Sequence, residues 1–92
     1  MLSEDGKVLL RTDGPDPKSG ITTIEFHVAE TGPTRLFVAD VLGELALALI
    51  DEVLDPGAYT VRIMPEQLSS GMYLCVLQTP VGSFGRMIQV RK

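Results

Sequence analysis

The chain has very little of the residues that carry most metal, redox and disulfide chemistry. Its 92 residues include one cysteine, Cys75, one histidine, His27, and no tryptophan. A single cysteine cannot form an internal disulfide, and no Cys or His spacing is typical of a zinc site. We therefore expect an apolar core to hold the fold, and we expect no metal and no cofactor.

Long hydrophobic runs are also missing. The longest candidate, residues 41–50, is interrupted by Gly43 and Glu44, whereas a membrane-spanning helix needs about 20 predominantly apolar residues. Near the amino end, Glu4 and Asp5 stand where a signal peptide would have a basic and then an apolar region. The sequence therefore predicts no transmembrane segment and no export signal at this end.

Negative charge is absent from the last part of the chain. All 12 carboxylates lie in residues 1–66 beside five basic residues, which gives that part a charge of −7. Residues 67–92 carry only Arg86, Arg91 and Lys92, and the net charge is −4. An acidic protein with a short basic end lacks the basic face that phosphate contacts require. We expect no nucleic-acid partner.

What the chain does have is frequent turn residues between short apolar segments. With 45% hydrophobic and 22% charged residues, it has the composition of one packed domain over residues 1–92. Glycine and proline recur at the spacing of an all-β domain. Residues 72–77 are apolar throughout and predict a central strand buried on both faces. Met64, Met72 and Met87 are expected in the core, and strands are predicted at residues 7–11, 22–28, 34–39, 59–63, 72–77 and 86–90.

Residues 44–54 fit two structures. Leu45, Leu49 and Val53 are spaced as on a helix face, while Leu45, Leu47 and Leu49 alternate as in a strand. The turn signals on either side favour the strand, and the helix stays an alternative. About seven antiparallel strands without a convincing helix predict an immunoglobulin-like β-sandwich.

Asp40 and Gly43 occupy the first and fourth positions of a four-residue segment, which is typical of a type I β-turn. The aspartate side chain can accept N–H bonds within such a turn, and glycine tolerates the left-handed exit. No second titratable residue is near Asp40 in the sequence. The pattern therefore favours a turn over a catalytic carboxylate.

No arrangement of reactive residues predicts an enzyme. His27 falls on the polar side of its strand, and Cys75 lies mid-strand among apolar neighbours, as a small buried hydrophobe does. The sequence has no nucleophile elbow and no phosphate-binding glycine loop. Carboxylates that might gather around calcium lack an EF-hand-like spacing and are expected to be solvated; they are Asp13, Asp16, Asp51, Glu52 and Asp55.

Three segments together resemble one protein family. They are VADVLGELALAL around Asp40 and Gly43, DPGAY around Gly57, and LSSGMY with Gly71 and Tyr73. In this order and spacing, over residues 15–92, they are similar to the carboxyl-terminal (type A) sorting domain of the bacterial type IX secretion system. The immunoglobulin-like domain of the flagellar hook-capping protein is a close relative of that family.

The resemblance implies a non-catalytic domain at the end of a larger exported cargo protein. Such domains are recognised by an outer-membrane translocon and a sortase, and the cargo reaches the cell surface or is secreted. The resemblance also implies that the last strand is the recognition strand, here with Arg86, Met87, Ile88, Val90, Arg91 and Lys92 as its candidate residues.

A second interpretation stays open at this point. The chain could be a structural or protein-interaction domain without sorting function, as in the hook-capping relative or a spacer module. Exposed strand edges would in either case leave room for a weak homodimer.

Overall fold

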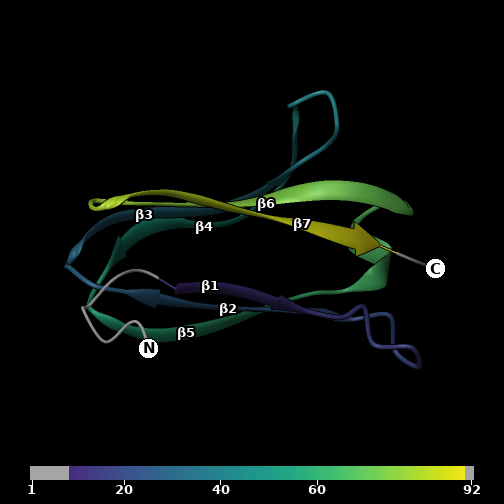
Figure 1. Ribbon diagram of the computed structural model, residues 1–92, viewed down its shortest axis with the longest axis horizontal. Helices are drawn as coiled ribbons and strands as arrows, with labels where there is room; N and C mark the ends of the chain where they lie inside the picture. Colours follow the sequence, from purple (N-terminus) through teal and green to yellow (C-terminus); the bar gives the residue numbers. More distant parts are fainter. Residues whose placement is uncertain (1–8, 91–92) are drawn as a thin grey trace.

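The computed structural model describes residues 9–90, which form seven strands and one short 3-10 helix (Figure 1). No helix in this part of the chain is long and apolar enough to cross a membrane. The all-β class predicted from the turn spacing is confirmed. The elements are β1 (Leu9–Asp13), β2 (Thr22–Val28), β3 (Gly32–Ala39), β4 (Leu45–Leu54), β5 (Gly57–Ile63), η1 (Pro65–Gln67), β6 (Gly71–Thr79) and β7 (Gly82–Val90).

The strands form two antiparallel sheets that face each other as two layers (Figure 1). One sheet has the order β1-β2-β5, and the other has the order β4-β3-β6-β7. This is the predicted immunoglobulin-like sandwich of seven strands. In constant-type immunoglobulin domains the fourth strand joins the sheet of the first, second and fifth strands. Here β4 pairs with β3 instead, so the sheet that contains β3, β6 and β7 is the wider one.

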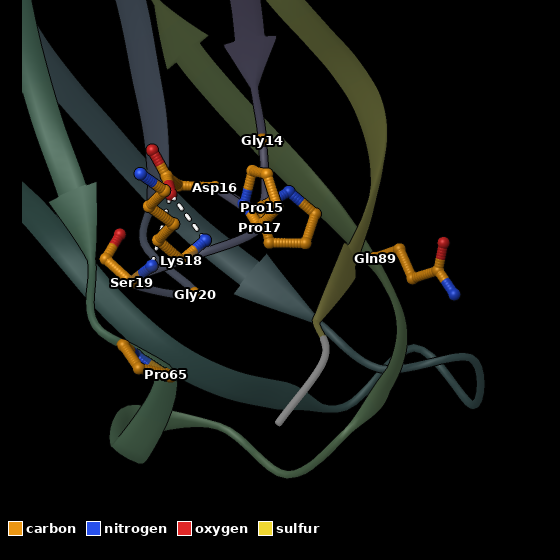
Figure 2. Close-up of a pocket in the computed structure, with 9 residues that line it drawn as sticks. All are labelled: Gly14, Pro15, Asp16, Pro17, Lys18, Ser19, Gly20, Pro65 and Gln89. Carbon is orange, nitrogen blue, oxygen red and sulfur yellow. Dashed lines mark hydrogen bonds between the residues drawn. The ribbon is translucent and has the colours of Figure 1, made fainter.

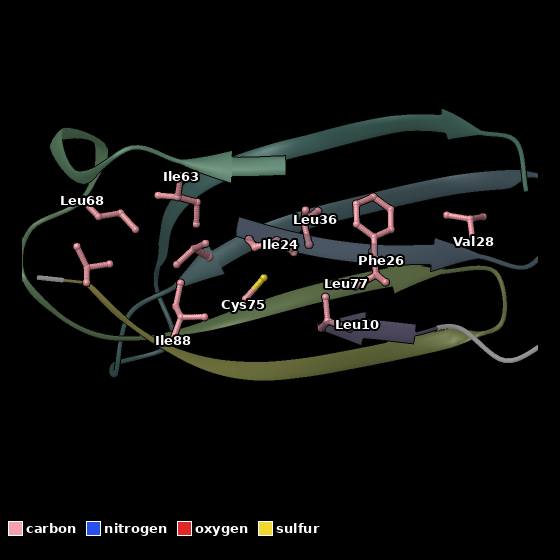
Figure 3. Close-up of a cluster of buried hydrophobic side chains, with 12 residues drawn as sticks. Leu10, Ile24, Phe26, Val28, Leu36, Ile63, Leu68, Cys75, Leu77 and Ile88 are labelled. Atoms are coloured by element: carbon pink, nitrogen blue, oxygen red, sulfur yellow. The ribbon is translucent and has the colours of Figure 1, made fainter. Parts of the chain in front are cut away.

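The hydrophobic core lies between the sheets (Figure 3). Successive side chains of a strand point to opposite faces, so each strand contributes alternate residues. In β2, for example, Phe26 is buried while Glu25 and His27 are exposed, as the alternation predicts. The Phe26 ring stacks on that of Tyr59 at a centroid distance of 5.3 Å. The buried cluster is Leu10, Ile24, Phe26, Val28, Leu36, Val38, Ile63, Leu68, Cys75, Leu77, Ile88 and Val90.

Two expectations about burial are wrong. The sequence predicts that residues 72–77 are buried on both faces, but Met72 and Leu74 of β6 are exposed. The reason is that no other described element covers the outside of the four-stranded sheet. Met64 and Met87, expected in the core with Met72, are exposed as well.

The segment with two interpretations, β4, is a strand. It pairs antiparallel with β3, but the register shifts twice, so that Ala46 and Leu49 of β4 have no opposite residue. Such bulges insert one extra residue into a strand. As a result Leu47 and Ile50 both face the inside although they are three positions apart. The inward residues therefore follow neither the helical spacing nor the strict alternation that the sequence suggests.

Asp40 builds the turn between β3 and β4. The N–H of Gly43 donates to the Asp40 carbonyl at 3.0 Å, and Asp40 Oδ1 accepts from the N–H groups of Leu42 and Glu44 at 2.9 and 3.0 Å. Gly43 has φ +85°, a left-handed conformation that suits glycine. The hairpin stands away from the outside of the four-stranded sheet (Figure 1). At its tip, Val41 and Leu42 are 75% and 81% exposed.

Candidate functional site

The terminal strand β7 forms one edge of the four-stranded sheet and pairs with β6 over its whole length. Ile88 and Val90 point into the core and are only 5% and 3% exposed. Met87 and Gln89 alternate with them along the strand and are exposed. The strand is therefore anchored by one face and accessible on the other.

Arg86, the first cation of the basic end, lies opposite Cys75 across the β6–β7 pair. Cys75 belongs to the core, so the Arg86 side chain leaves the strand on the side of the facing sheet. Its Nε donates to the carbonyl oxygen of Leu10 in β1 at 3.1 Å. This bond ties the edges of the two sheets together. The remaining predicted recognition cations, Arg91 and Lys92, lie outside the described residues.

An exposed apolar surface covers the outside of the four-stranded sheet, and we call it the outer face. Phe37 lies opposite Val76, and Leu74 lies opposite Met87. The guanidinium carbon of Arg35 is 4.9 Å from the centroid of the Phe37 ring. Scattered exposed apolar residues are ordinary, but contiguous ones mark interaction surfaces. The outer face consists of the exposed Met72, Leu74 and Met87 and the half-buried Phe37 and Val76.

Gly71 and Tyr73 form a latch at the start of β6. Gly71 has φ +154°, and the Tyr73 hydroxyl donates to the carbonyl oxygen of Ser69 at 2.8 Å. A tyrosine bonded to the backbone just before its strand is the tyrosine corner of immunoglobulin-like sandwiches. Gly71 lies opposite Val90 and Tyr73 opposite Ile88. The latch therefore holds the part of β6 that supports the end of β7.

The same latch occurs at the start of β5, at the other end of the molecule. Gly57 has φ +153°, and the Tyr59 hydroxyl donates to the carbonyl oxygen of Asp55 at 2.6 Å. Sequence reasoning singled out Gly57 but missed the role of Tyr59. The signal was present, because both segments place a glycine two residues before a tyrosine. Gly57 lies in the three-stranded sheet opposite Val28, so the structure does not bring it to β7.

A pocket of about 730 Å³ lies beside the end of β7 and is walled by the loop of residues 14–20 (Figure 2). Asp16 Oδ1 accepts from the N–H groups of Lys18 and Ser19 at 2.8 and 3.1 Å. These two hydrogen bonds stabilise the carboxylate and hold the pKa of Asp16 below its ordinary value, and the bond from Lys18 has the larger effect. The Asp16 carboxylate is thus already hydrogen-bonded within its own loop. The lining residues are Gly14, Pro15, Asp16, Pro17, Lys18, Ser19, Gly20, Pro65 and Gln89.

The reactive side chains of the described residues lie apart from one another. Cys75 is fully buried, and burial raises the pKa of its thiol to about 11, so the thiol stays protonated at neutral pH. His27 is exposed on β2. Within residues 9–90, no group of three or more His, Cys, Asp or Glu side chains could hold a metal ion.

Comparison with known proteins adds no relative. The chain matches no protein-family model, and a search of curated proteins finds no match either. The resemblance to sorting domains therefore rests on the three sequence motifs.

Proposed function

We propose that the chain is a non-catalytic sorting and anchoring domain that directs an exported cargo protein across the bacterial outer membrane to the cell surface. The motif resemblance motivates the proposal, and the position of β7 supports it most. This terminal strand is an edge of its sheet, with Met87 and Gln89 exposed. An edge strand offers unpaired main-chain groups to which a partner can add a strand.

The anchored face of β7 suits recognition by a partner. Ile88 and Val90 are buried, and Arg86 is bonded to Leu10, so the strand is already ordered before any partner arrives. A preformed strand loses less conformational entropy on binding than a disordered segment does, which increases affinity. The partner then contacts Met87 and Gln89 and the main-chain edge beside them.

The partners in this proposal are an outer-membrane translocon and a sortase, and the domain lies at the carboxyl end of the cargo protein. Arg91 and Lys92 follow β7 directly in the sequence, and nothing acidic follows Glu66. A basic segment next to the recognition strand would attract an acidic partner surface and speed association. Localisation is then the cell surface or the medium.

A fusion tests this function. Residues 1–92 are placed after a signal peptide and a reporter, in a host with type IX secretion, and the reporter at the cell surface is quantified. We expect surface display with the native domain. We expect its loss when Met87→Glu and Gln89→Glu are combined, because both charges lie on the accessible face of β7. A reporter that stays periplasmic with the native domain would contradict the proposal.

The matched control is Ala58→Glu, which adds an exposed charge on β5 in the other sheet, opposite His27. It should leave display unchanged. Circular dichroism of each purified domain shows whether a variant is folded, so that lost recognition is separated from lost structure. The tail variant Arg91→Ser with Lys92→Ser should also reduce display, since it removes the two charges that would attract an acidic partner surface.

The outer face favours a second candidate, a structural or protein-interaction domain without sorting function. Its apolar residues, including Phe37, Leu74 and Met87, suit packing against a neighbouring domain. In this case Leu74→Lys would release the neighbour while the reporter fusion with the native domain stays periplasmic. The two candidates therefore give opposite results in the display assay.

A further inference from the structure

The other edge of the four-stranded sheet, formed by β4, is less covered than its neighbour β3. Ile50 and Glu52 of β4 lie opposite Leu36 and Thr34 of β3, and opposite residues point to the same side of the sheet. Leu36 and Thr34 are buried, whereas Ile50 is half-buried and Glu52 is exposed. A carboxylate on the inner side is exposed because β4 extends beyond the narrower facing sheet.

Residues 50–54 are the regular part of this edge. They pair with β3 in unbroken register, and both register shifts fall before Ile50. An unbroken edge strand presents a continuous row of unpaired N–H and C=O groups. On its inner side Glu52 stands between Ile50 and Leu54, both half-buried. This stretch therefore offers a main-chain ladder and apolar surface that a further strand could cover.

The charges of residues 50–54 indicate which kind of strand could pair with this edge. Asp51 Oδ2 lies 4.0 Å from Arg35 Nε. The other ion pair among residues 9–90 joins Arg11 to Glu25, so Glu52 has no basic partner in this part of the chain. Two β4 strands side by side would place the Glu52 carboxylates of both copies on the same inner side, which disfavours a second copy of this chain. A strand with a basic residue opposite Glu52 would be attracted instead.

We propose that residues 50–54 form a docking edge for an extended segment of a partner protein, added as a fifth strand of the sheet. On one face this segment carries a lysine or arginine between two apolar residues. The basic side chain meets Glu52, and the apolar ones cover Ile50 and Leu54. This edge is distinct from β7, which lies at the opposite side of the same sheet.

A peptide titration of the full chain tests the proposal. The probe is the acetylated and amidated heptapeptide Thr-Val-Thr-Lys-Thr-Val-Thr, which has the proposed pattern on one face. In ¹⁵N NMR spectra we expect it to shift the amides of residues 50–54. Glutamate in place of the lysine should weaken binding about tenfold, which corresponds to about 1.4 kcal/mol. N-methylation of alternate peptide amides should abolish binding, because it removes the main-chain donors.

A charge swap gives the sharpest control. The Glu52→Lys variant should prefer the glutamate peptide over the lysine peptide, whereas Glu66→Lys on η1 should leave the original preference unchanged. Glu52 and Glu66 are both exposed, so both variants are expected to fold. Shifts centred on β7, equal binding of both peptides, or a β4-mediated dimer of the free chain would each overturn the proposal. The measurement uses the isolated chain, so its outcome is independent of the export assay.

Discussion

The two edges of the four-stranded sheet differ in what lies across from them in the other layer. At the β7 edge, Ile88 is buried and Arg86 donates to Leu10 of β1. At the β4 edge, Ile50 is only half-buried and the inward Glu52 is exposed. Both edges belong to one sheet, and β4 is the more apolar of the two in sequence. The difference arises because the facing sheet has one strand fewer.

Unequal sheet widths therefore assign different roles to the two edges. Burial of apolar surface contributes about 25 cal/mol per Å², so the covered β7 edge contributes more to stability than the overhanging β4 edge. The β4 edge keeps surface and charge available for binding. Three pairs of variants and one pH titration test this difference.

The largest expected effect comes from one isoleucine at each edge. We expect Ile88→Ala to lower the free energy of unfolding by about 3 kcal/mol and Ile50→Ala by about 1 kcal/mol. The buried side chain loses packing and leaves a cavity, whereas the half-buried one already contacts water. Urea unfolding followed by circular dichroism measures both values. Equal losses would mean that β4 is as well covered as β7.

The two tyrosine latches give the next effect. Tyr73→Phe and Tyr59→Phe each remove one hydroxyl bond and keep the ring, so each should cost about 1 kcal/mol. Their local effects should differ. Amide exchange should quicken in β6 and β7 for Tyr73→Phe, and at the end of β4 for Tyr59→Phe, since Asp55 follows that strand. Identical exchange maps would argue against two separate latches.

Arg86→Met removes the tie between the sheets and keeps an apolar stem of similar length. The carbonyl of Leu10 loses its donor in a partly buried place, so we expect a loss of about 0.5–1 kcal/mol. Arg62→Met on β5 is the matched control, because Arg62 is exposed and makes no such bond among the described residues. Stability measured by urea unfolding should fall only in the first variant. An equal fall in both would show that charge, not the bond, matters.

The smallest effect concerns pH and the loop beside β7. The folded pKa of Asp16 is lowered, so the carboxylate's contribution to stability is present above its ordinary pKa of 3.8 and is lost as pH falls through the folded value. The amide signals of Lys18 and Ser19 should move over this acidic range and stay constant at neutral pH. Asp16→Asn should abolish the movement. Signals that titrate above pH 5 would contradict this assignment.

Local chemistry made much of the fold predictable. The alternation in residues 22–28 and the spacing of Asp40 and Gly43 are set by contacts within a few residues, and both predictions agree with the structure. Burial of β6 and the methionines was predicted wrongly, because an apolar sequence does not say whether a second layer covers it. Met87 is apolar and exposed for this reason.

The candidate site could be predicted only in part. The terminal strand was located from the sequence, but the bond from Arg86 to Leu10 joins residues 76 positions apart. No local pattern indicates such a contact. The exposure of Glu52 on the inner side of β4 could not be predicted either, since it depends on which sheet β4 joins.

Turn positions and the alternation of residues between core and solvent follow from the amino-acid sequence, because turn geometry and side-chain periodicity are local properties. Which sheet β4 joins depends on the packed structure, and its pairing with β3 makes the β3-β6-β7 sheet the wider one. That width sets which edge is anchored and which is exposed. Coverage depends on strands distant in sequence, so the two edges acquire different properties only when the sheets pack.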